Sequence, residues 1–338
     1  MSTPNITHSL GAPINGLVWN TDTVAAACGD GTLHLTRAGM SKTLAVQVST
    51  SPLLAVISVP EGFATASESG EIHITTPQGD SRLLAATKYM FLETIVYFAK
   101  KNQILAATGK KITVIPLNTQ HPTLDTLPHT LPSTVAGLAL SPIGPRLAVS
   151  HYGGATILPL DNIKNDPRLL PWKGSHLGLT YSPDGKWLIS AMQEQAIHLW
   201  RLSDGLDLQM RGYPSKITQF SWSSTEATLA TNGGGGVPLW DFSTPKGPAG
   251  TQARVLADSG SQTTLVSAVA MHPKGPFCAI GYTDGLTLLT QIVEDRAVLL
   301  HHPNEKPTTH LAWHPTGMYL ATASAADTLT LTDFATLV

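Results

Sequence analysis

The sequence predicts an all-β chain made of repeated units, and three observations indicate it. A short apolar strand that ends in a bulky residue recurs about every 40 residues along the whole 338-residue chain. Gly and Pro separate the strands, and no long segment has the periodicity of an amphipathic helix. The bulky landmarks are Trp19, Val59, Phe98, Leu140, Tyr181, Trp222, Met271 and Trp313. A period of this size is typical of a propeller or a solenoid.

The fifth repeat shows most clearly what one unit contains. Its strands are expected at residues 177–181, 187–191, 196–202 and 206–210. The turn at 182–185 reads Ser-Pro-Asp-Gly, in which Pro presets one backbone angle and Gly supplies a positive φ. Four short antiparallel strands per repeat predict a propeller blade.

The repeats are expected to begin near residues 14, 53, 93, 135, 176, 216, 265 and 308, within one domain covering residues 1–338. The last repeat has room for three strands only, whereas residues 5–10 form an alternating stretch without a partner. Pairing this N-terminal strand onto the last blade as its outer strand would hide two open sheet edges and close the propeller. The sequence favours eight blades, with seven as the alternative if the first or third repeat is irregular.

The turns and third strands resemble WD40 repeats over the full length of the chain. The turn recurs at 141–144, 182–185, 272–275 and 314–317, and Trp240-Asp241 is the one Trp-Asp pair. The family's polar network is largely missing, because no Gly-His pair occurs and third-strand Trp residues remain only at Trp200 and Trp240. We therefore expect the blades to be held mainly by apolar packing between their faces.

Composition limits the classes of partner. The charged fraction is 13% and the net charge −2, and basic runs end at the pairs Lys100-Lys101 and Lys110-Lys111. Nucleic acid is therefore not an expected partner. No apolar run reaches about 18 residues and no secretory leader is visible, so no membrane partner is expected. Cys28 and Cys278 are expected to be buried thiols in a reducing, cytoplasmic setting.

The 13 histidines are interpreted mainly by their repeat position. His34, His73 and His198 share a third-strand position, and His272 and His314 precede Pro in matching turns. His301 and His302 are not expected to converge with other ligands, so neither a metal nor another cofactor is predicted. The alternative is a propeller that binds a transition metal or small ligand through histidines, or that assists a metal-handling partner.

The sequence offers no candidate catalytic residue, and no enzyme activity is expected. It has no Gly-x-Ser-x-Gly elbow and no His-Glu-x-x-His motif. The run Gly233–Gly236 is followed by Val-Pro-Leu-Trp-Asp, so it lacks the Lys and the helix of a phosphate loop. It is interpreted as a turn.

The remaining prediction is a non-enzymatic scaffold that binds one or more proteins through the loops of one rim. Interface hot spots favour Tyr, Trp and Arg. The expected rim residues are Tyr89, Phe91, Tyr152, Trp172, Arg211, Tyr213, Tyr282 and His302. The alternative for residues 90–92 is that these apolar side chains only cover the core.

Overall fold

The computed structural model describes residues 5–119, 122–261 and 263–334, and over these residues the chain is all-β as expected. The described residues form 30 strands and one short 3₁₀ turn, Ala99–Lys101. No helix in this part of the chain is long and apolar enough to span a bilayer. The chain divides into two compact halves: a terminal half (Met1–Gln47 with Gln219–Val338) and a central half (Val48–Thr218).

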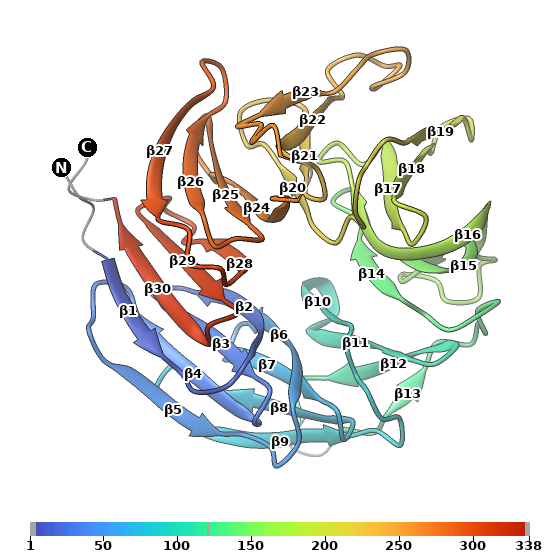
Figure 1. The fold of residues 1–338 in the computed structure, drawn as a ribbon. Helices are drawn as coiled ribbons and strands as arrows, with labels where there is room; N and C mark the ends of the chain where they lie inside the picture. Colours follow the sequence, from blue (N-terminus) through green and yellow to red (C-terminus); the bar gives the residue numbers. More distant parts are fainter. Residues whose placement is uncertain (1–4, 120–121, 262, 335–338) are drawn as a thin grey trace. The chain divides into compact units, whose positions relative to one another are not determined.

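The terminal half holds four sheets of four strands each (Figure 1). The first contains β2 (Ile14–Asn20), β3 (Thr23–Cys28), β4 (Thr32–Arg37) and β5 (Thr43–Gln47). The second contains β20 (Phe220–Trp222), β21 (Thr228–Thr231), β22 (Val237–Asp241) and β23 (Arg254–Leu256). The third contains β24 (Val266–Met271), β25 (Phe277–Tyr282), β26 (Thr287–Gln291) and β27 (Arg296–His301). The fourth has the order β1 (Asn5–Ser9), β30 (Thr328–Asp333), β29 (Tyr319–Ser324) and β28 (Thr308–Trp313).

The central half holds two sheets of four strands and one of six. The first contains β6 (Leu53–Val59), β7 (Gly62–Ser67), β8 (Glu71–Thr75) and β9 (Ser81–Ala86). The second contains β10 (Ile95–Phe98), β11 (Gln103–Thr108), β12 (Lys111–Pro116) and β13 (Asp125–Thr126). The six-stranded sheet runs through β14 (Gly137–Leu140), β15 (Arg146–Pro159), β16 (Arg168–Tyr181), β17 (Trp187–Met192), β18 (Ala196–Arg201) and β19 (Asp207–Met210).

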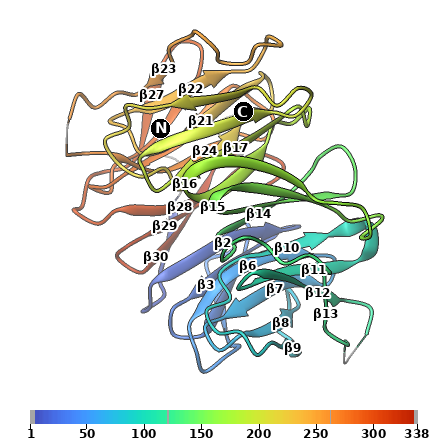
Figure 2. The same ribbon diagram turned by 90° about the vertical axis from the view of Figure 1, so that its right-hand side faces the viewer.

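The described strands thus form seven sheets, the alternative number, and not the eight that the landmarks favoured. The fourth and fifth repeats share the six-stranded sheet through the 14-residue strands β15 and β16, which lie side by side (Figures 1 and 2). The N–H of Leu160 donates to the carbonyl of Pro145 at 2.8 Å, which places the two ends of β15 beside each other. β15 therefore turns back at Gly153 and Gly154, whose φ angles are 91° and 137°.

The N-terminal strand β1 is the outer strand of the fourth sheet of the terminal half. It pairs antiparallel with β30 in a register from Asn5↔Thr332 to Ser9↔Thr328. The hydroxyl groups of Thr7 and Thr330 are 3.0 Å apart across this pair. β1 therefore covers the edge that β30 would otherwise leave open.

Two landmark Trp residues tie neighbouring sheets of the terminal half together. The indole N–H of Trp19 donates to the Ala312 carbonyl on β28 at 2.9 Å, and that of Trp313 donates to the Ala270 carbonyl on β24 at 3.1 Å. His314 packs edge-on against Trp19, with ring centroids 5.0 Å apart. The His that precedes Pro in the turn thus supports the landmark of the next sheet, as its repeat position indicated.

The core lies between the faces of neighbouring sheets. β3 is buried along its whole length, and its residues from Val24 to Cys28 are small enough to let inner strands crowd together. Cys28 and Cys278 are both buried free thiols on inner strands, as expected. Burial raises the pKa of each thiol to about 12, so both are neutral and unreactive.

Candidate functional site

The segment from Tyr89 to Phe91 displays apolar side chains at one rim of the central half. The Phe91 side chain is 57% exposed, whereas the next residue, Leu92, is fully buried. The alternative that these residues only cover the core is therefore correct for Leu92 but not for Phe91. Phe91 has φ 58°, a left-handed conformation that is strained for a bulky residue.

Hydrogen bonds hold this segment in a fixed conformation. The N–H of Phe91 donates to the Glu68 carbonyl at 2.8 Å. The Thr87 hydroxyl donates to the Tyr89 carbonyl at 3.0 Å and accepts from the Tyr89 N–H at 3.2 Å. The backbone that carries Phe91 is consequently pre-organised, which lowers the entropy lost when a partner covers the residue.

Tyr152 belongs to the same rim, because a series of contacts connects it with Tyr89. The Tyr89 ring lies against Gly109, where a Cβ would stand 3.2 Å from ring carbon Cε2. The Gly109 carbonyl accepts from the N–H of Val135 at 2.8 Å. The Ser133 hydroxyl, two residues earlier, accepts from the N–H of Tyr152 at 2.8 Å. The Tyr152 side chain is 68% exposed.

The rim continues to Arg211 at the end of β19. Tyr152 pairs with Ser175, whose carbonyl accepts from the N–H of Gln193 at 2.9 Å. Beyond the turn that follows Gln193, Ile197 pairs with Met210, the residue before Arg211. Arg211 is exposed, and its Nε donates to Gln209 Oε1 at 2.7 Å. We call Tyr89, Phe91, Tyr152 and Arg211 the aromatic rim.

Trp172 lies between these residues but is half-buried and faces inward. Its indole stacks on the His198 ring at 4.1 Å with an interplanar angle of 18°. His198 is fully buried, and burial, helped by nearby His176, lowers its pKa to about 3. Trp172 therefore covers a neutral histidine and offers a partner only part of its surface.

Tyr213 and Tyr282 were expected on the rim, but both are buried. Tyr213 is 7% and Tyr282 1% exposed, so neither is available to a partner. Tyr282 ends β25 facing the apolar core, and its hydroxyl donates to the Ala257 carbonyl at 2.5 Å. Spacing placed both residues near a loop, but it did not show which way each side chain points.

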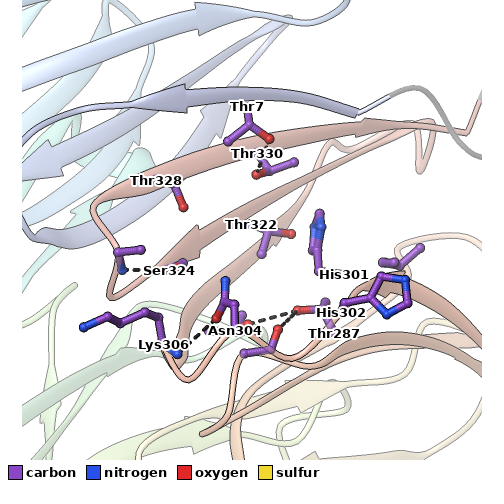
Figure 3. Close-up of a pocket in the computed structure, with 14 residues that line it drawn as sticks. Thr7, Thr287, His301, His302, Asn304, Lys306, Thr322, Ser324, Thr328 and Thr330 are labelled. Atoms are coloured by element: carbon purple, nitrogen blue, oxygen red, sulfur yellow. Dashed lines mark hydrogen bonds between the residues drawn. The ribbon is translucent and has the colours of Figure 1, made fainter.

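His302, the last expected rim residue, belongs to the terminal half and lines a pocket there. The pocket has a volume of about 390 Å³ and lies between the third and fourth sheets of that half (Figure 3). Threonine and serine hydroxyls dominate its lining, together with Asn304, Lys306, His301 and His302. His302 is exposed, and its ring points away from Thr322 (Figure 3).

The sequence did not reveal this pocket, although its signal was present. Residues 328–332 read Thr-Leu-Thr-Leu-Thr, which gives β30 one hydroxyl face and one apolar face. His301 is half-buried, and burial lowers its pKa. Within the described ranges, no three His, Cys, Asp or Glu residues are grouped so that they could hold a metal ion.

Comparisons with known proteins agree with the geometry. Residues 295–333 match the family model described as WD domain, G-beta repeat. A segment of 125 residues is 24% identical to an uncharacterized RWD, RING finger and WD repeat-containing protein of Schizosaccharomyces pombe. That segment covers 34% of this chain and 9% of the yeast protein, so the chain matches only a small part of that relative.

Two solved structures are similar over nearly the whole chain. The computationally designed Ika8 protein has a TM-score of 0.75 at 15% identity, covering 98% of both chains. The C-terminal WD40 domain of Sif2 has a TM-score of 0.72 at 13% identity, covering 98% of this chain and 97% of that one. At this level of identity the similarity shows the fold alone.

Proposed function

From the WD40-type β-propeller fold that the chain adopts, we propose a non-enzymatic scaffold that binds one or more proteins through the aromatic rim. WD40 propellers generally bind other proteins and are generally not enzymes. The observation that carries the proposal is Phe91, an exposed aromatic residue held by hydrogen bonds in a strained backbone conformation. Such strain persists at binding sites when the surroundings enforce it.

The composition of the aromatic rim suits a protein interface. Tyr, Phe and Arg are enriched at the centres of protein interfaces, where charged residues other than Arg are depleted. Fully burying a Phe side chain contributes about 1.5–3 kcal/mol, so covering the exposed 57% of Phe91 contributes about 0.9–1.7 kcal/mol. The proposal places the protein in the cytoplasm, which its two free, buried cysteines support.

The experiment replaces Phe91 by Asn and measures binding of a captured partner. Asn tolerates a left-handed backbone better than most residues, so Phe91→Asn removes the ring without adding strain. We expect binding to weaken about 5- to 20-fold, because the lost burial is worth about 0.9–1.7 kcal/mol. Tyr152→Ala should act in the same direction, since Tyr152 lies on the same rim.

The matched control is Leu83→Asn. Leu83 is an apolar residue of the same half, 48% exposed, but it lies on the outer strand β9 away from the rim. Partner affinity should be unchanged in this variant. Circular dichroism checks that both proteins are folded. If Phe91→Asn then binds the partner as tightly as the unmodified protein does, the rim is not the binding surface.

A further inference from the structure

We propose that the pocket beside His301 binds an oxyanion group, either a phosphate or a carboxylate. Its lining offers hydroxyl, amide, imidazole and ammonium groups, all able to donate hydrogen bonds. Among the residues that the structure describes, no carboxylate side chain lines it. This inference concerns the terminal half and does not depend on the aromatic rim.

The two faces of the fourth sheet of the terminal half differ in a way that packing does not explain. One face carries Ala321, Ala323, Leu329 and Leu331, which pack with the sheet β2–β5 in an apolar cluster. The opposite face carries Thr322, Ser324, Thr328 and Thr330 along the pocket (Figure 3). A sheet between two other sheets is stabilised by apolar burial on both faces. Where the pocket lies, the hydroxyl face lacks the stabilisation that apolar burial would contribute.

Two polar atoms at the pocket lack a partner. Thr322 is 4% exposed, and its hydroxyl makes no hydrogen bond within the described residues. Nε2 of the half-buried His301 ring is likewise buried and unpartnered there. Buried polar groups are nearly always hydrogen-bonded, because leaving one unpaired costs free energy. A ligand oxygen would give the Thr322 hydroxyl an acceptor, and would do the same for His301 in the tautomer that carries the proton on Nε2.

Lys306 supplies the positive charge. Its side chain is exposed and runs past the Ser324 end of the pocket, away from Thr322 and His301 (Figure 3). Among the residues that the structure describes, Lys306 has no acidic side chain within ion-pair distance. An ammonium at the mouth of a hydroxyl-lined pocket is complementary to an anionic oxygen.

The turns around the pocket contain acidic residues whose carboxylates do not line it. Asp284 Oδ1 accepts from the N–H of Leu286 at 3.0 Å, and Glu305 is exposed to solvent. These charges oppose the long-range attraction of an anion. We therefore expect affinity to come from short hydrogen bonds inside the pocket, and to be modest for a free ion.

Gly285 and Asn304 fix the shape of the mouth. A Cβ at Gly285 would collide with Asn304 Oδ1, so only glycine allows the Asn304 side chain its position. Asn304 Oδ1 accepts from the N–H of Lys306 at 3.0 Å, which orients the amide beside the pocket. The Asn304 amide is therefore held in place before a ligand arrives.

The test is a titration followed by the backbone amide signals around Thr322 in NMR spectra, at constant ionic strength maintained with sodium chloride. The probes are sodium phosphate, sodium acetate and the neutral polyol glycerol. We expect saturable shifts with phosphate, acetate or both, and the more effective anion identifies the source of the oxyanion. No saturable shift with either anion, or an equal response to glycerol, would overturn the proposal.

Three variants locate the site. Thr322→Val and Lys306→Gln should each weaken anion binding at least fivefold. Thr332→Val is the matched control, because Thr332 is also buried on the fourth sheet with an unpartnered hydroxyl but does not line the pocket. A Thr332→Val effect as large as that of Thr322→Val would overturn the assignment. Lys306 is exposed, so Lys306→Gln tests the proposal even if Thr322→Val does not fold.

Discussion

At the scale of single residues, His198 shows how burial controls charge in this chain. Its two ring nitrogens are buried and make no hydrogen bond within the described residues. Trp172 stacks on one side, and Trp200 lies edge-on with ring centroids 4.5 Å apart. The Asp207 carboxylate is 3.8 Å from Nε2, but its side chain is 45% exposed and too well solvated to offset burial.

The low pKa of His198 predicts how stability depends on pH. Burial depresses the folded-state pKa to about 3, below the ordinary value of 6.5, so the unfolded chain binds more protons between these values. His198 therefore lowers the free energy of unfolding as the pH falls from 6.5 toward 3. In His198→Phe this contribution disappears, and the slope should fall by up to about 1.4 kcal/mol per pH unit.

Urea unfolding of both proteins at several pH values between 7 and 4 measures the two slopes. The buried histidines remote from His198 titrate in both proteins and cancel in the comparison. If His198→Phe leaves the slope unchanged or makes it steeper, then Asp207 rather than burial controls the protonation of His198.

At the scale of elements, strand β15 depends on the glycines at which it turns. Gly154 has φ 137°, and a Cβ there would collide with the Leu170 carbonyl on β16. Gly153 has φ 91°, but a Cβ there would meet nothing within 4 Å. A substitution at Gly153 therefore tests backbone strain alone, whereas one at Gly154 tests strain together with a steric collision.

Alanine substitutions at the two glycines should differ in their effect. Gly153→Ala is expected to cost about 1 kcal/mol of unfolding free energy through backbone strain. Gly154→Ala should cost at least about 2 kcal/mol, because it adds the collision with β16. Chemical denaturation of the two variants checks this order, and equal losses would show that β15 and β16 separate without cost at this point.

The sequence predicted the strand pattern well at this scale, but not how the repeats join. The Gly-Pro punctuation marked the turns, and the N-terminal strand pairs with β30 where its alternation indicated. The sequence favoured eight blades, whereas the described strands form seven sheets. The two repeats join because β15 and β16 continue from one to the other, and this depends on backbone angles that the spacing of the landmarks does not reveal.

At the scale of the molecule, the fold followed from periodicity, whereas the site depended on side-chain direction. Spacing placed Phe91 and Tyr282 in comparable loops, yet one is exposed and the other is in the core. The hydroxyl face of β30 was visible in the alternation of residues 328–332. The sequence could not show that this face lines a pocket, because that depends on which sheet lies opposite in the tertiary structure.

Site-specific crosslinking tests whether the aromatic rim binds a partner protein. A photoreactive phenylalanine analogue is placed at Phe91, at Tyr152 or at the control position Leu83 in the full chain, and the crosslinked proteins are identified after irradiation of cells. We expect Phe91 and Tyr152 to crosslink the same protein and Leu83 not to crosslink it. The claim would be contradicted if that protein were crosslinked equally from Leu83, or if Phe91 and Tyr152 gave no common product.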